Sequence, residues 1–325
     1  MTDIYFEERY ARLYEVIENG ETVVWNLESE YGKIRYIFLK RRIDIELDEP
    51  FFDITTPYGY GGPIIIEVSD RDKLLEEFTD KFSQYCVENN IVSEFVRFHP
   101  IVGNALDFVE HYSPTYMRKT VATQIDLSSE HSPFLLEFNQ SSRKLARKAE
   151  KNGLTARITE SPNNLETFLS IYHETMDRTG ANDFYFFDYH YFQSCIESFK
   201  ERLLLIEIIY EEKVVSSCIY FIGDKVLHEH LMGTLSEYLS YNPVYLMKKV
   251  AVEWAKDNKI ELVHYGGGLT NTEDDKLFQF KRKFTKETLF DFYIGKKIYN
   301  SKVYEILCSK KKVSLSDTFF PAYRK

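Results

Sequence analysis

The order of the predicted elements indicates a mixed α/β protein (an α+β arrangement with mixed sheets) that has one sheet in each half. Helical and strand-like segments alternate along all 325 residues. Hydrophobic residues make up 44% and charged residues 28% of the chain, a balance typical of a folded globular protein rather than a disordered one. A chain of this length is expected to form about two domains, each large enough to bury its own core.

In the first half, helices are recognised by apolar residues three or four apart and strands by alternation. Tyr31-Gly32 separates two strand-like runs as a hairpin turn would, and Asn152-Gly153 ends a basic helix. The predicted elements are a helix over 5–18, strands over 21–28 and 33–39, a short apolar run over 64–68, a helix over 70–89, strands over 92–98 and 117–127, and a helix over 133–152.

In the second half, Ser161-Pro162 precedes one predicted helix and Pro243 lies in the first turn of another. The predicted elements are a strand over 154–159, helices over 163–178 and 188–200, strands over 202–210, 213–222 and 225–233, a helix over 243–258, a strand over 260–265, a helix over 273–283, a strand over 287–294 and a helix over 296–309.

The order of elements begins again after residue 153, which is a weak internal repeat with little sequence identity. We therefore expect an N-terminal domain over 1–153, a second domain over 154–295, and a C-terminal tail over 296–325.

Charge and cysteine content narrow the class of protein. The chain carries 41 Lys and Arg against 51 Asp and Glu, a net charge of −10. That balance argues against a protein that coats DNA, because such binding needs a positive surface. The four cysteines, Cys86, Cys195, Cys218 and Cys308, are far apart and are predicted to be buried and reduced. No signal peptide or transmembrane segment is predicted, so a cytoplasmic location is expected.

Several motifs, taken in order along the chain, resemble the FemAB family. They are the stretch 57–63 (PYGYGGP), 95–100 (FVRFHP), 143–153 (RKLARKAEKNG), 172–178 (YHETMDR), 184–187 (FYFF), 266–268 (GGG) and 277–284 (LFQFKRKF). Any one of them alone would be weak evidence. Together they cover roughly residues 20–290.

This resemblance implies two tandem GNAT-type acyltransferase domains without a coiled-coil arm, and a tail that packs back on the first domain. It also implies an enzyme that transfers an aminoacyl group from aminoacyl-tRNA to an amine of a nucleotide- or lipid-linked peptidoglycan precursor. In this reading the aminoacyl-tRNA is a co-substrate, and no other cofactor is expected. The amino acid transferred, the acceptor and the oligomeric state are left open.

Lys281 is the predicted catalytic residue. The pair Phe280-Lys281 matches a Phe-Lys motif of the family, whose lysine is implicated in stabilising the reacting ester. Phe280 and Phe284, one helical turn apart, would fix the direction of Lys281. Without the resemblance, the run 281–283 reads as a solvated helix end.

Two glycine-rich turns are candidate substrate-binding segments. Gly266, Gly267 and Gly268 follow a predicted strand and would let backbone N–H groups approach an anion. Tyr58 and Tyr60 flank Gly59 and would line a cleft. The alternative is that both segments are ordinary turns.

Histidines and an arginine complete the predicted substrate site. His228 and His230 share one face of a predicted strand, and His230 is the candidate for substrate binding. Arg178 and Tyr185 flank a turn and would contact an anionic acceptor. Each also has a structural reading, as a half-buried histidine or a helix C-terminal cation. No metal site is predicted, because no third ligand has suitable spacing.

Basic residues are concentrated in three segments of this acidic chain. Residues 143–151 hold five cations against Glu150, residues 281–286 hold four, and residues 296–312 hold six against Glu305. Such segregation is expected of an acidic enzyme that binds tRNA on one face, although basic helices are also common as solvated surfaces. The candidate tRNA-binding residues are Arg143, Arg147, Lys148 and Lys283.

Two other functions stay open at this point. An acyl-CoA-dependent N-acyltransferase acting on an amino sugar or another small amine would use acetyl-CoA. The usual GNAT pyrophosphate loop, Arg/Gln-x-x-Gly-x-Gly/Ala, does not occur at the corresponding junction, 232–245 (MGTLSEYLSYNPVY), which counts against this alternative. The third function is a non-catalytic binding module.

Overall fold

The computed structural model describes residues 3–47 and 49–325 and divides the chain into two compact units. One unit comprises residues 5–117 and 291–325, and we call it the N-unit. The other comprises residues 1–4 and 118–290, and we call it the C-unit. Both contain a mixed sheet with helices, so the predicted α/β class is confirmed.

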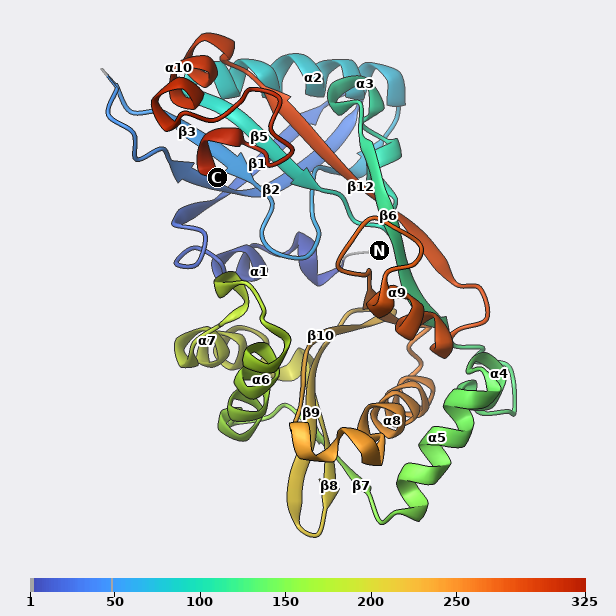
Figure 1. Ribbon diagram of the computed structural model, residues 1–325. Coiled ribbons are helices and arrows are strands. Elements are labelled where there is room, and N and C mark those ends of the chain that lie inside the picture. Colours follow the sequence, from blue (N-terminus) through green and yellow to red (C-terminus); the bar gives the residue numbers. More distant parts are fainter. Residues whose placement is uncertain (1–2, 48) are drawn as a thin grey trace. The chain divides into compact units, whose positions relative to one another are not determined.

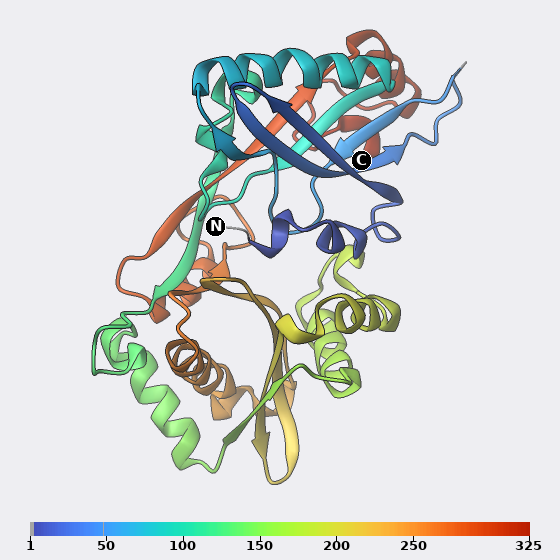
Figure 2. The same cartoon turned by 180° about the vertical axis from the view of Figure 1, so that it is seen from behind.

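The N-unit is built on strands β1 (Gly20–Ser29), β2 (Gly32–Arg42), β3 (Phe52–Thr55), β5 (Ile91–Arg97) and β12 (Leu289–Ile298), which neighbour one another in that order. Strand β4 (Ile64–Val68) pairs with β2. Helix α2 (Arg71–Glu88), capped by Asp70, lies along one face of this sheet (Figure 2). Short helices α1 (Glu8–Arg12) and α3 (Val109–Tyr112) complete this part of the unit.

The C-terminal tail packs within the N-unit. Helix α10 (Ser301–Lys311) contributes Tyr304 and Leu307 to a small core. Near the end of the chain, the Tyr323 hydroxyl lies 2.7 Å from Ser93 Oγ, and Arg324 Nε donates to the buried Asp53 carboxylate over 2.6 Å. These contacts anchor the tail on β3 and β5.

The C-unit has a sheet with the order β6 (Thr115–Gln124), β11 (Leu262–Gly266), β10 (Val226–Thr234), β9 (Lys213–Ile222), β8 (Leu203–Tyr210) and β7 (Thr155–Glu160). Figure 1 shows α6 (Glu166–Thr179) and α7 (Tyr189–Phe199) on one side of strands β8–β10. Helices α5 (Gln140–Lys151) and α8 (Pro243–Asp257) lie on the other side, where α5 and the preceding α4 (Pro133–Glu137) both contact α8.

The division of the chain differs from the expected boundary at 153. Residues 118–153 belong to the C-unit, because β6 pairs with β11 there, whereas β12 from the second half pairs with β5 in the N-unit. Each half of the sequence thus contributes one strand to the sheet of the other half. The local sequence pattern of a strand does not show which strand, far away in the sequence, it will pair with.

Three predicted helices are clearly shorter than expected. The helix predicted over 273–283 is α9 (Lys276–Lys281) followed by a 3-10 turn (Arg282–Phe284). The helix predicted over 5–18 is a 3-10 turn (Ile4–Phe6) followed by the five residues of α1. The helix predicted over 133–152 is divided into α4 and α5 at Phe138-Asn139, where the Asn139 side chain caps α5 by accepting the Ser142 N–H over 2.8 Å.

In the described part of the chain, no helix exceeds the 18 residues of α2, which fits the expectation that a coiled-coil arm is missing. No helix described here has the length and apolar character needed to cross a membrane. All four cysteines are buried and unpaired with one another, as predicted.

Candidate active site

Lys281 is the last residue of the short helix α9 (Lys276–Lys281) in the C-unit. Phe278 and Phe284 are buried in the unit's main core, and the ring of the partly buried Phe280 lies 5.1 Å from that of Phe284. These aromatic contacts direct the half-buried Lys281 toward the end of β11, where its Nζ donates to the Gly267 carbonyl over 2.7 Å.

The charge of Lys281 is strongly perturbed. Burial lowers the pKa of its ammonium to about 8. The cations Lys248 and Arg118 lower this pKa further, whereas Glu229 and Asp275 raise it. A lysine with such a pKa exists in both protonation states near neutral pH, which is typical of reactive sites.

The glycine-rich turn after β11 presents its carbonyl groups to cations. Gly267 O accepts from Lys281, and Gly268 O accepts from Arg118 Nη1 over 2.6 Å. Gly266 has a φ of 74°, which favours glycine. The N–H groups of Leu269 and Thr270, which follow the three glycines, donate to the Asp275 carboxylate over 2.9 and 2.7 Å. That the N–H groups of the glycines themselves bind an anion stays a prediction.

Asp275 connects the turn to helix α9. Its other carboxylate oxygen accepts the Phe278 N–H over 2.8 Å and so caps α9. Burial favours the neutral acid, but the N–H groups of Phe278, Thr270 and Leu269 and the Thr270 hydroxyl lower its pKa to about 2. A Cβ on Gly268 would lie 2.4 Å from an Asp275 oxygen, so only glycine fits there without a shift. The turn and the catalytic candidate are therefore held by one carboxylate.

A buried ion pair lies near Lys281. Glu229 on β10 and Lys248 on α8 form a salt bridge, and their side chains are only 8% and 1% exposed. We did not predict a functional role for these two residues from the sequence. A signal existed for Lys248, because it falls on the apolar face of α8, beside Met247 and one turn before Ala251 and Val252.

Strands β10 and β11 separate close to this pair. They pair in parallel only from Val226–Leu262 to His228–His264, although β10 continues to Thr234 and β11 to Gly266. Glu229 is the first residue of β10 beyond this pairing. The candidate site therefore lies where the sheet opens between its two parallel strands.

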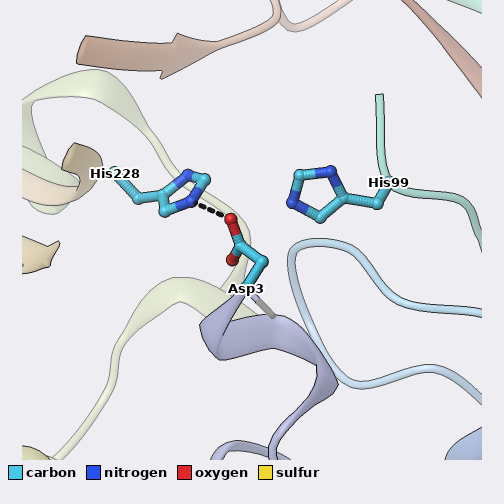
Figure 3. A group of neighbouring side chains, drawn as sticks. All are labelled: Asp3, His99 and His228. Atoms are coloured by element: carbon cyan, nitrogen blue, oxygen red, sulfur yellow. Dashed lines mark hydrogen bonds and ion pairs between the residues drawn. The ribbon is translucent and has the colours of Figure 1, made fainter. Parts of the chain in front are cut away.

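His228 and His230 flank Glu229 on β10, whose pairing with β9 is irregular between Glu229 and Leu231. His228 Nε2 lies 2.8 Å from Asp3 Oδ2 (Figure 3), and His230 Nε2 lies 2.6 Å from the Tyr191 hydroxyl of α7. Burial and the neighbouring His228 lower the pKa of His230 to about 3. His230 is therefore neutral at physiological pH and a weak general base.

Arg178 and Tyr185 lie on the side of the C-unit that carries α6 and α7. Arg178 is exposed in the last turn of α6 and donates weakly to the Thr234 carbonyl, over 3.4 Å. Tyr185 is 36% exposed, and its carbonyl accepts the Tyr172 hydroxyl over 2.6 Å. An open groove of about 640 Å³ runs along α6. It is lined by Thr167, Ser170, Ile171, Glu174, Lys213, Val214, Leu235, Ser236 and Glu237.

Tyr58 and Tyr60 belong to the N-unit, in the loop between β3 and β4. The Tyr10 hydroxyl donates to the Tyr58 carbonyl over 2.9 Å, and the Tyr60 ring packs against His99 and Phe292 at 5.5 Å from each. Of the predicted site residues, the structure thus brings together Lys281 and the three glycines in one place of the C-unit.

The predicted tRNA-binding residues are placed on two elements. Arg147 and Lys148 are exposed on α5, opposite the buried Ala146 and Ala149. Arg143 is partly buried, and its Nη1 donates to the carbonyls of Leu135 and Phe138 at the end of α4, a structural contact. Lys283 follows α9, with its ammonium 5.8 Å from the Phe280 ring centre.

Comparisons with known proteins agree with this fold. Residues 137–282 match the acetyltransferase (GNAT) domain family. The structure is similar to a crystal structure of FemX, with a TM-score of 0.70 and 13% identity over 94% of each chain. It is also similar to the C-terminal domain of a putative lysylphosphatidylglycerol synthetase from Agrobacterium fabrum, with a TM-score of 0.56 and 12% identity over 98% of this chain and 95% of that one. A search of curated protein sequences finds no match.

These findings confirm the predicted FemX-like architecture, and they support an acyltransferase as its activity, because the GNAT match includes Lys281, the glycine-rich turn and the Glu229–Lys248 pair. At 13% identity the similarity to FemX concerns the fold.

Proposed function

We propose that the protein is an aminoacyltransferase that moves the aminoacyl group of an aminoacyl-tRNA to an amine of a nucleotide- or lipid-linked cell-wall precursor. The observation that carries this proposal is the Lys281 ammonium, desolvated and fixed at the glycine-rich turn where β10 and β11 separate. The FemX-like fold supports the same class of reaction.

In this reaction the acceptor nitrogen attacks the carbonyl carbon of the ester that joins the amino acid to the tRNA. Negative charge develops on the carbonyl oxygen, and the bond to the ribose oxygen then breaks. The nitrogen loses one proton, and the departing ribose oxygen gains one to become a hydroxyl group. A desolvated ammonium stabilises such charge far better than a solvated one. Lys281 would supply this ammonium, and the contacts of Phe278, Phe280 and Asp275 would keep it in place.

A second candidate function is acyl transfer from acetyl-CoA, which the GNAT family match over 137–282 favours. The junction between β10 and α8 argues against it. There the N–H groups of Leu235, Tyr238 and Asn242 donate to carbonyls of the chain, and Pro243 has no N–H to offer a pyrophosphate. The proposal therefore keeps tRNA as the donor.

The test is a transfer assay with a charged tRNA pool and, separately, with acetyl-CoA, using amine-bearing cell-wall precursors as acceptors. Lys281→Ala should lower the transfer rate roughly 10²- to 10³-fold, as expected when a group that stabilises an oxyanion is removed. Lys276→Ala is the matched control, because Lys276 is an exposed lysine at the other end of α9. Transfer from acetyl-CoA alone would favour the second function, and full activity of Lys281→Ala would remove Lys281 from the mechanism.

The pH dependence gives a further check. If the protonated Lys281 is the active form, the rate should fall as the pH rises through about 8, where this ammonium loses its proton. Lys281→Arg keeps its charge in this range, so its falling limb should move to higher pH.

A further inference from the structure

The ion pair between Glu229 and Lys248 has no role in the reaction described so far. Glu229 Oε2 contacts Lys248 Nζ and also lies 3.4 Å from the Tyr220 hydroxyl. The Lys248 ammonium lies 4.2 Å from the centre of the Tyr265 ring and 5.7 Å from that of Phe284. The pair is thus enclosed by aromatic rings and removed from water.

Such a pair is costly to bury, and replacing it by apolar residues is often neutral or stabilising. Its position is therefore the informative feature. It connects β10, at the point where β10 leaves β11, to α8. The Lys248 ammonium lies over Tyr265, two residues before the Gly267 carbonyl that accepts Lys281 Nζ, and over Phe284, three residues after Lys281. At this position both charges act on Lys281. The other charged groups that act on Lys281 are Arg118 of β6 and Asp275 at the start of α9.

We propose that Glu229 and Lys248 are positioning residues that set the protonation of Lys281. The negative charge of Glu229 stabilises the protonated form of Lys281, and the positive charge of Lys248 opposes this effect. The catalytic part of this proposal rests on the proposed function of Lys281. Burial is the largest cause of the low pKa of Lys281, and the two charges of the intact pair act on it in opposite directions.

The proposal predicts effects of opposite sign for the two partners. Glu229→Gln removes a negative charge and should lower the pKa of Lys281, whereas Lys248→Met removes a positive charge and should raise it. The double variant should return close to the wild type. Loss of stability alone would move both single variants in the same direction.

The protonation of Lys281 can be measured without any acyl donor or acceptor. The full-length protein is treated with trace acetic anhydride across neutral and alkaline pH, and the acetylation of Lys281 is quantified by mass spectrometry, with the exposed Lys276 as internal reference. We expect shifts of about one pH unit in opposite directions for the single variants. Equal titration of Lys281 in the wild type, both single variants and the double variant would overturn the proposal.

The transfer assay then tests the catalytic part. The falling limb of the pH profile should shift with the Lys281 titration, and Lys248→Arg should restore the wild-type profile. If Lys248→Met does not fold, Glu229→Gln and the double variant, which leave no unpaired Glu229 carboxylate, still test the sign. Opposite titration shifts without transfer from any donor would refute the proposed function but support the electrostatic coupling. Transfer whose pH profile is the same in all variants, although the Lys281 titration shifts, would refute the catalytic part, because the proton on Lys281 would then not control the rate.

Discussion

At the scale of single residues, the candidate site depends on the hydrogen bonds that the Asp275 carboxylate accepts. One oxygen caps α9, which ends in Lys281, and the other binds the backbone after the glycine-rich turn. A carboxylate that accepts several N–H groups stabilises the folded state only while it is ionised. The stability of the site therefore depends on pH through Asp275, independently of the protonation of Lys281.

Asp275→Ala should reduce the free energy of unfolding by about 1–2 kcal/mol at neutral pH, the usual cost of a lost N-cap. The folded-state pKa of Asp275 is lowered to about 2, so its contribution is complete above the unfolded value of 3.8 and is lost as the pH falls through about 2. Urea unfolding at neutral and acidic pH would measure this, with Asp274→Ala as the exposed control. Equal stability of the two variants at neutral pH would contradict this role.

At the scale of elements, the predictions succeeded where the pattern is local. The hairpin β1–β2, helix α2 and the strands β8–β10 lie within three residues of their predicted ends. The predictions failed where a helix cap interrupts a sequence pattern that is otherwise helical, as at Asn139, which caps α5. Lys281 and its aromatic neighbours were found from sequence, but Glu229 was not, because its buried partner lies 19 residues away on α8.

Helix α6 packs against β10 through a glycine. A Cβ on Gly233 would lie 2.7 Å from the backbone of Ile171 and Tyr172, so the helix would have to move. Gly233→Ala should therefore cost about 1–3 kcal/mol of stability. It should also weaken acceptor binding if Arg178 contributes to it, because Arg178 lies on this helix. The thermal unfolding of Gly233→Ala should be compared with that of Ser170→Ala, a substitution on the exposed side of α6 that adds no bulk. Unchanged stability would mean that α6 adjusts freely.

At the scale of the whole molecule, both units are built from segments that are distant in sequence. The chain passes between the units after residues 4, 117 and 290, and β6 and β12 are exchanged between the halves. Sequence patterns showed two α/β halves but not this exchange, because a strand's pattern records which face is buried and not which strand it pairs with. The net charge of −10 is likewise a property of the whole chain that conceals local basic surface.

The basic surface of α5 gives the last prediction. Lys144, Arg147 and Lys148 are exposed on the side of α5 away from its contact with α8. Replacing all three by Gln should weaken tRNA binding and reduce the slope of log affinity against log salt by about 2, since each phosphate contact contributes roughly 0.7–0.9.

The control for α5 removes the same number of positive charges elsewhere. Lys33, Lys73 and Lys81 are exposed cations of the N-unit that are already paired with carboxylates. Their replacement by Gln should leave both the affinity and the salt slope near the wild-type values, because cations that are already paired with carboxylates do not neutralise phosphates and so release no counterions from the tRNA. Equal losses in both triple variants would show that tRNA responds only to net charge. If neither variant loses affinity, α5 is a solvated surface and the donor must be held elsewhere.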